Sequence, residues 1–215
     1  MHVSAVIFDL NGTILEDEDE YSKAFKRVLK NLGVDIKTSF PQERGIGVKE
    51  NWEKLIQKYN IKTDKSAELL VKETQEEYLR EISEVTVRPG FNDFIDNLKN
   101  NEIKLAIATS NTWEQTDKIL DTLGLQDIFD VITTGDEVSY NKPDPDIFLL
   151  TADKLGVERE DCLVIEDSLA GIKAAKRAGM KVIAISSEGD SDIFSKADLV
   201  VESFSEITAQ AIDQL

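Results

Sequence analysis

The sequence predicts an α/β fold in which a parallel sheet carries helices on both faces and a helical segment follows the first strand. Short apolar runs alternate with amphipathic helical patterns, which is typical of parallel strands joined by helices. Three helical patterns are followed at once by glycine, the usual signal for the end of a helix. The segment 17–85 lacks a convincing strand, and its apolar positions recur at helical spacing.

Strands are predicted where short apolar runs occur. The first run is Val3–Phe8, and it ends in the polar loop Asp9-Leu10-Asn11-Gly12-Thr13. Two later runs also end in polar residues, at Thr109-Ser110-Asn111 and at Glu166-Asp167-Ser168. The further predicted strands are Ile103–Ala108, Val131–Thr133, Asp161–Ile165, Lys181–Ile185 and Leu199–Val201.

The inserted segment is predicted to form three or four helices. They are separated by stop signals at Asn31-Leu32-Gly33 and Tyr59-Asn60, and Arg88-Pro89-Gly90 marks the return to the sheet. We therefore divide the chain into an α/β core, residues 1–16 and 86–215, and a helical insertion, residues 17–85. The length of 215 residues suits one domain that carries an insertion. We expect Trp52 and Trp113 to lie in the hydrophobic core.

Four helices are predicted in the core. Phe94, Ile95 and Leu98 give the first an amphipathic face. The other three helices span Thr112–Leu123, Asp146–Leu155 and Ser168–Ala178, and they stop at Gly124, Gly156 and Gly179.

The composition limits the chemistry. Lys and Arg total 25 against 42 Asp and Glu, and the net charge of −17 argues against nucleic acid bound through a basic surface. No apolar run reaches the ~18 residues of a transmembrane candidate. The N-terminus lacks the pattern of a signal peptide, so we expect a cytoplasmic protein with no membrane partner. Cys162 is the only cysteine and His2 the only histidine, which excludes an intrachain disulfide and a histidine-based triad.

Polar residues at the predicted strand ends suit phosphoryl transfer. Ligands of parallel sheets bind outside the carboxyl ends of the strands, where we expect Asp9, Thr109, Ser110, Lys142, Glu166 and Asp167. Asp9 would attack phosphorus and form an aspartyl-phosphate. Asp9 and Asp167 would hold Mg²⁺, while Lys142 and Thr109 bind the phosphoryl oxygens. Taken singly, Lys142 would be a solvated lysine, and Thr109-Ser110 an ordinary helix N-cap.

Four motifs occur in order along the chain. They are Phe8-Asp9-Leu10-Asn11-Gly12-Thr13, Ile107-Ala108-Thr109-Ser110-Asn111, Asn141-Lys142-Pro143-Asp144-Pro145 and Ile165-Glu166-Asp167-Ser168-Leu169-Ala170-Gly171-Ile172. This ordered set resembles the haloacid dehalogenase superfamily, in the subfamily with an all-helical cap after the first motif. The resemblance covers nearly the whole chain. It implies a doubly wound, Rossmann-like core, with residues 17–85 as the cap.

The resemblance also implies the role of each motif residue. Asp9 is the nucleophile, and Thr109, Ser110 and Lys142 bind the transferring phosphoryl group. Asp9, Asp167 and the backbone carbonyl of Asn11 ligate Mg²⁺, with Glu166 beside them in the metal site. The acidic pair favours metal-dependent phosphoryl transfer over dehalogenation.

One residue departs from the family pattern. The family's second Asp is the general acid and base, and here it is Asn11. An amide cannot exchange that proton at neutral pH, and losing such help typically costs about 10²–10⁴-fold in rate. The sequence therefore predicts a slowed Mg²⁺-dependent phosphatase. The alternative is a phosphate-binding or regulatory protein that has lost the chemistry. A naturally weak enzyme and an engineered trapping variant both fit.

The cap gives less information about the substrate. The segment Gly45-Ile46-Gly47-Val48-Lys49-Glu50 resembles that of phosphoglycolate-phosphatase-like members, and Arg44 or Lys49 would contact the remote end of the substrate. Sugar-phosphate mutases of the subfamily carry a histidine in the hinge helix, and Glu20-Tyr21-Ser22 has none. We expect a phosphatase acting on a small phosphorylated metabolite, with a mutase-like member as the alternative and the oligomeric state open.

Overall fold

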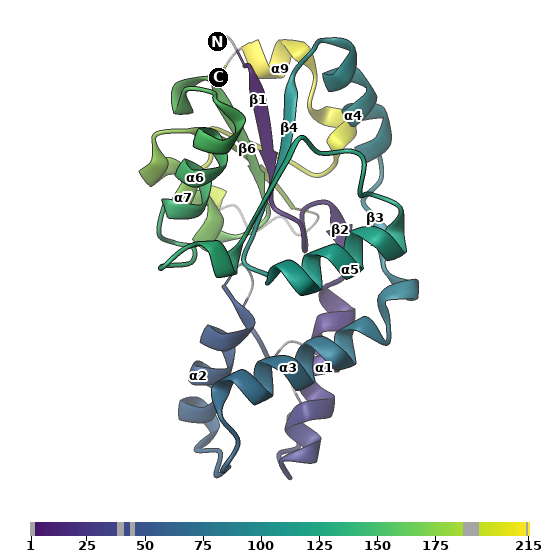
Figure 1. Cartoon of the computed structure of the whole chain (residues 1–215), viewed down its shortest axis with the longest axis vertical. Coiled ribbons are helices and arrows are strands. Elements are labelled where there is room, and N and C mark those ends of the chain that lie inside the picture. Colours follow the sequence, from purple (N-terminus) through teal and green to yellow (C-terminus); the bar gives the residue numbers. More distant parts are fainter. Residues whose placement is uncertain (1–2, 38–40, 44–45, 187–193, 214) are drawn as a thin grey trace.

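The computed structural model describes residues 3–37, 41–43, 46–186, 194–213 and 215. Figure 1 shows an α/β core above a group of helices that forms a cap, and the strands of the core run towards the cap. The core has the predicted α/β architecture with a parallel sheet. Within the described part of the chain, no helix combines the length and apolarity needed to cross a membrane.

Six parallel strands form the core sheet in the order β5-β4-β1-β6-β7-β8. All six predicted apolar runs form strands. The central strand β1 is buried along its whole length, because helices cover both faces of the sheet. The strand bounds are β1 (Ala5–Phe8), β4 (Lys104–Thr109), β5 (Val131–Thr134), β6 (Cys162–Glu166), β7 (Lys181–Ile185) and β8 (Leu199–Val201).

The core helices pack in two layers. One face of the sheet buries Ile7 and Ala106 against α6 (Asp146–Leu155) and α7 (Leu169–Ala178). The other face buries Phe8 against α4 (Phe91–Asn100), α5 (Trp113–Leu123) and the short η4 (Phe204–Glu206). Short helices among the described core residues also include η2 (Gly135–Glu137), η3 (Arg159–Asp161) and α9 (Ala209–Asp213).

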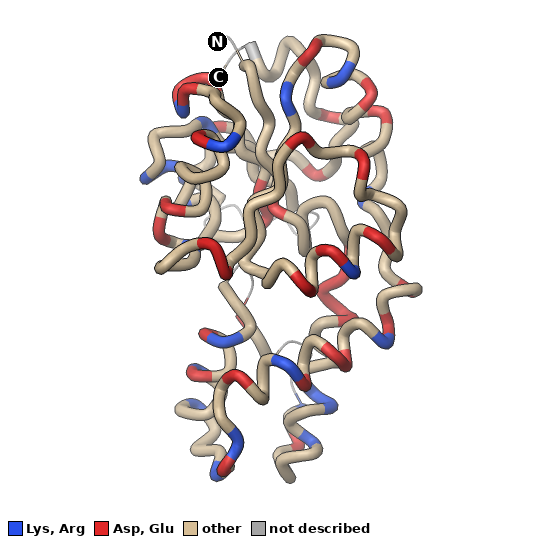
Figure 2. Tube along the Cα trace, viewed as in Figure 1, with Lys and Arg blue, Asp and Glu red and all other residues tan. Residues whose placement is uncertain are grey.

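The cap contains the predicted helices α1 (Glu18–Asn31), α2 (Val48–Tyr59) and α3 (Ala67–Leu79), followed by η1 (Ile82–Glu84). These helices bury a small core of their own that includes Phe25, Trp52 and Leu70. Acidic residues fill the first turn of α1, where they suit the positive end of the helix dipole. Figure 2 shows this acidic turn where the chain leaves the core.

A two-stranded antiparallel ribbon joins the core to the cap. β2 (Leu15–Glu16) pairs with β3 (Thr86–Val87), so the chain leaves and returns at one place. Neither of these two strands is predicted from the sequence. Arg88 supports the ribbon from the core side, since its guanidinium donates to the carbonyl oxygen of Thr13 at 3.0 Å.

The prediction that both tryptophans are buried holds only for Trp52. Its indole lies in the cap core and donates to the hydroxyl of Thr74 at 2.8 Å. The prediction for Trp113 is wrong, because 52% of this residue is exposed at the start of α5.

Candidate functional site

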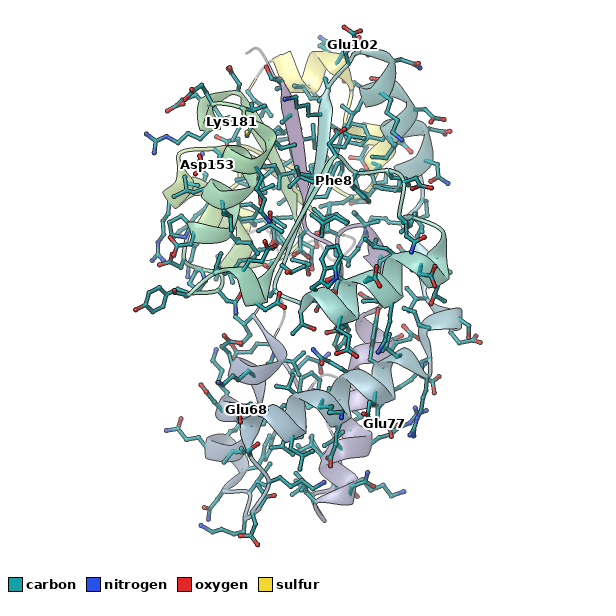
Figure 3. All side chains as sticks on the ribbon, in the orientation of Figure 1. Phe8, Glu68, Glu77, Glu102, Asp153 and Lys181 are labelled. Carbon is teal, nitrogen blue, oxygen red and sulfur yellow. The ribbon has the colours of Figure 1, made fainter. Side chains whose placement is uncertain are left out.

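Three neighbouring strands bring the predicted site residues together. Phe8 lies inside the core (Figure 3) and pairs in register with Ile107 of β4 and Ile165 of β6. Asp9 follows β1 directly, so it lies between the residues that end the strands on either side. Those residues are Thr109 and Glu166. The parallel register therefore fixes this part of the site.

Lys142 is buried among the carboxylates of the site. Its Nζ donates to Asp9 Oδ1 at 2.5 Å, to Glu166 Oε1 at 2.8 Å and to the carbonyl oxygen of Ala108 at 2.9 Å. Burial by itself would lower the pKa of this lysine, but the charges of Asp9 and Glu166 outweigh burial and raise it above its usual value. The alternative of a solvated lysine is wrong, because only 3% of Lys142 is exposed.

Glu166 faces protein donors with both carboxylate oxygens. Oε1 accepts from Lys142, and Oε2 accepts from the backbone N–H and the hydroxyl of Ser168, both at 2.8 Å. Ser168 is also the N-cap of α7, and its hydroxyl oxygen accepts from the N–H of Gly171 at 3.0 Å. A Cβ at Gly171 would lie 1.7 Å from Glu166 Oε1, so only glycine leaves room for this carboxylate.

Asp167 approaches the loop that follows β1. Its Oδ1 accepts from the neutral hydroxyl of Thr13 at 2.9 Å. Gly12 has φ +81°, and a Cβ there would lie 2.3 Å from Asp167 Oδ2. Glycine at this position therefore supplies both the left-handed conformation and the space for the carboxylate.

Asp9 and Asp167 suit a divalent cation by the chemistry of their oxygen donors. Burial raises the pKa of Asp9 to about 7, although the charge of Lys142 opposes this shift. Burial and then the charges of Glu166 and Asp9 raise the pKa of Asp167 well above its usual value. A hard cation bound to both carboxylates would relieve this cost, as Mg²⁺ does with oxygen ligands. Among the described residues, no group of three or more His, Cys, Asp or Glu side chains is arranged to hold a metal ion.

The candidate phosphate-binding residues Thr109 and Ser110 line the same cavity as Asp9 and Asp167. The hydroxyl oxygen of Thr109 accepts from the N–H of Asn111 at 3.2 Å. The Ser110 Oγ is buried, and no described residue hydrogen-bonds to it. The N-cap of α5 is Thr112, so the N-cap alternative for Thr109-Ser110 is wrong.

Asn11 lies at the junction of the core and the cap. Its Oδ1 accepts from Asn111 Nδ2 at 2.6 Å, and its Nδ2 donates to Asp17 Oδ2. Asp17 also accepts from the hydroxyl of Tyr78 at 2.6 Å and from the N–H of Gly12 at 3.0 Å. Burial raises the pKa of Asp17 to about 6, against the effect of these hydrogen bonds.

Asp17 is the site residue that sequence reasoning missed. It belongs to the acidic run Glu16–Glu20, whose pattern indicates only the start of a helix. The run does begin a helix, but Asp17 is 1% exposed and lines the cavity. Its position before the first helical residue is the only signal in the sequence.

A cavity that is open to solvent lies between the core and the cap. The cap side is lined mainly by Glu18, Tyr21, Gln42, Glu43, Ile46, Gly47, Val48 and Asn51. Lys49 is exposed, and its Nζ lies 3.2 Å from Glu68, which Figure 3 labels on the cap. Arg44 lies outside the described residues. The predicted contact of Lys49 with a substrate stays a prediction.

Comparison with known proteins points to one family. The family model for haloacid dehalogenase-like hydrolases matches residues 6–185. The phosphorylated carbohydrates phosphatase of Thermotoga maritima is 36% identical, and the match covers 84% of each chain. The β-phosphoglucomutase of Bacillus subtilis is 32% identical, with 99% of this chain and 95% of that protein covered.

A solved structure agrees with these relatives. The crystal structure of CbbY from Rhodobacter sphaeroides in complex with phosphate has a TM-score of 0.86 and 30% sequence identity. The likeness covers 99% of this chain and all of that chain, so it includes both the core and the cap.

Proposed function

The chain belongs to the haloacid dehalogenase-like hydrolase family, and from this premise we propose that it is a Mg²⁺-dependent phosphatase of a small phosphorylated sugar. One observation carries the proposal. The buried ammonium of Lys142 joins Asp9 to Glu166 at the ends of adjacent strands. A carboxylate oriented by a buried cation, near the Ser110 hydroxyl to which no described residue hydrogen-bonds, suits attack on a phosphoryl group.

Each site residue has a role in this proposal. Asp9, with its carboxylate oriented by Lys142, attacks phosphorus, and the new O–P bond forms as the P–O bond to the sugar breaks. The sugar oxygen leaves with a proton from solvent, and water then hydrolyses the aspartyl-phosphate to inorganic phosphate and free Asp9. Thr109 and Ser110 bind the phosphoryl oxygens together with Lys142. The cap covers the site and excludes water during transfer.

Asp9, Asp167 and the backbone carbonyl of Asn11 would hold the proposed metal. When bound, Mg²⁺ would neutralise charge on the phosphoryl group. The sequence motif predicts Glu166 at the metal as well. Because its oxygens accept from Lys142 and Ser168, we propose instead that it orients Lys142 from beside the metal rather than ligating it.

The substrate class comes from the relatives and the cavity. The Thermotoga phosphatase acts by name on phosphorylated carbohydrates, and the Bacillus mutase by name on a phosphoglucose. Gln42 lines the cavity, and its buried Oε1 has no hydrogen-bond partner among the described residues, which suits a sugar hydroxyl. The mutase relative makes isomerisation of a sugar phosphate the second candidate.

The test is release of inorganic phosphate from a panel of sugar monophosphates with and without Mg²⁺. We expect slow release that requires Mg²⁺ and disappears in Asp9→Asn. The same reactions should be searched for isomerised sugar phosphate, which would favour the mutase. Saturable binding of the sugar phosphates without release or isomerisation would contradict the enzyme and favour the binding role.

A further inference from the structure

We propose that Asp17 is a positioning residue for Asn11, and that the two side chains form a matched pair which adapts the site to an amide at position 11. This inference rests on the proposed function for its kinetic consequence. Its structural part stands on the hydrogen bonds alone.

Both ends of the Asn11 carboxamide have a partner of the opposite kind. The carbonyl Oδ1 accepts from the Nδ2 of Asn111 at 2.6 Å, and the Nδ2 donates to the carboxylate of Asp17. Asn111 Nδ2 can only donate, and the carboxylate can only accept when ionised. The surroundings therefore fix which end of the amide faces which neighbour.

Asp17 is itself held in place by two further donors. The hydroxyl of Tyr78 donates to Oδ2 at 2.6 Å, and the N–H of Gly12 donates to Oδ1 at 3.0 Å. Tyr78 belongs to α3 of the cap, whereas Gly12 belongs to the loop after β1. The carboxylate is buried and cannot turn towards solvent.

The same contacts form a closed circuit between the cap and the core. Asn111 Oδ1 accepts from the hydroxyl of Tyr21 at 3.3 Å, and the rings of Tyr21 and Tyr78 are stacked with centroids 4.0 Å apart. The circuit runs from Tyr78 through Asp17, Asn11 and Asn111 to Tyr21. Asn11 thus links the carboxylate of Asp17, at the start of the cap, to Asn111 of the core.

Exchange of Asn11 for Asp alone breaks this match. An oxygen would replace the Nδ2 that now faces Asp17 Oδ2, so a half-buried carboxylate would oppose a buried one. The Tyr78 hydroxyl, 2.6 Å from Asp17 Oδ2 and 3.4 Å from the present Asn11 Nδ2, carries one proton and could donate to only one of them. Exchange of Asp17 for Asn alone breaks it from the other side, because two amide NH₂ groups would compete at one place.

Exchange of both residues restores the pairing of one amide with one carboxylate, and the negative charge moves from position 17 to position 11. The amide placed at position 17 keeps an oxygen for the Gly12 N–H and turns its NH₂ towards position 11 and the Tyr78 oxygen. The carboxylate placed at position 11 then accepts from that NH₂ and from Asn111. A carboxylate held in this way regains the proton transfer that an amide cannot perform.

The experiment compares Asn11→Asp, Asp17→Asn and the double variant with the wild-type chain. The readouts are the thermal unfolding midpoint in chelator at pH 8 and the kcat and KM for the best sugar monophosphate. We expect each single variant to unfold at lower temperature and the double variant to recover the wild-type midpoint. The kcat of the double variant should rise by about 10²–10⁴-fold with little change in KM.

A matched control keeps the net charge of the double variant. Asn11→Asp combined with Asp19→Asn removes an exposed carboxylate two residues further along, and it should not rescue the midpoint or kcat. Additive effects of the two exchanges on the midpoint, or an Asn11→Asp variant as stable and active as the double variant, would overturn the pairing. If no variant releases phosphate, the proposed function fails, and the midpoints still decide the pairing.

Discussion

Replacement of Lys142 by Met removes the only described cation that contacts Asp9 and Glu166. The ammonium is 2.5 Å from Asp9 Oδ1 and 2.8 Å from Glu166 Oε1, and the lysine side chain is 1% exposed. Removing one partner of a buried ion pair costs about 3–5 kcal/mol, because the remaining charge stays buried without compensation. We expect a loss of at least this size in the free energy of unfolding at pH 8.

The loss should depend on pH. Without the lysine, burial would hold the pKa of Asp9 above its unfolded value of about 4. Groups with raised folded-state pKa values stabilise the fold only when protonated, so stability falls as pH rises through that range. The pKa of Asp9 is about 7 even beside the lysine, and the deficit should therefore be larger at pH 8 than at pH 5.

The assay is urea unfolding in chelator at both pH values. Lys154→Met is the matched control, because its ammonium contacts Glu137 at 2.5 Å with both side chains about one-third exposed. Such a surface pair contributes about 0–1 kcal/mol. Should Lys142→Met not fold at pH 8, Lys142→Met/Glu166→Gln removes one unpaired charge and should recover part of the stability. A loss equal to that of Lys154→Met and independent of pH would show that Lys142 does not compensate the buried carboxylates.

Three further predictions concern the metal, the loop after β1 and the cap. Mg²⁺ at 100 times its Kd should stabilise the chain by about 2.7 kcal/mol in thermal unfolding, and Asp167→Asn should abolish the shift; a shift in that variant equal to wild type would count against this ligand. Gly12→Ala and Gly156→Ala both place alanine at positive φ, at a cost of about 1–2 kcal/mol. Only Gly12→Ala should also remove the Mg²⁺ shift, because nothing lies within 4 Å of a Cβ at Gly156. Residues 17–85 should move as a unit about the ribbon, so solution scattering should show compaction with Mg²⁺ and a phosphoryl analogue; an unchanged radius of gyration would contradict cap closure.

The strands and core helices could be predicted because each has a local signal. β1 is a buried apolar run, and α6 begins and ends at the predicted residues Asp146 and Leu155. Given those strands, the carboxyl-end rule for parallel sheets is sufficient to bring Asp9, Thr109 and Glu166 to one edge. The order of the four motifs along the chain predicts the other site residues, which include Lys142 and Asp167.

The ribbon and Trp113 could not be predicted for a physical reason. β2 and β3 have two residues each, and two residues carry no periodicity. Trp113 is apolar and lies in a helical pattern, but its side of α5 is exposed. Propensity identifies the helix and does not by itself settle which of its residues are covered.

The role of Asp17 depends on contacts that lie far apart in the sequence. Its partner Tyr78 is 61 residues away, on a helix whose packing no local pattern specifies. Asn11 itself stands out as a departure from the family motif, but its partners Asn111 and Asp17 do not. The unusual residue is therefore visible in the sequence, whereas the groups that hold it are visible only in the fold.

The most direct test of the account is acid quenching during turnover, followed by peptide mapping of the chain. Because Asn11 cannot activate water, hydrolysis of the aspartyl-phosphate should be slow, and the intermediate should accumulate. The account predicts a single phosphoryl group, labile to hydroxylamine, on the peptide that carries Asp9, formed only with Mg²⁺ and a sugar monophosphate. Release of phosphate with no phosphoryl group on Asp9, or a group attached to another residue, would contradict it.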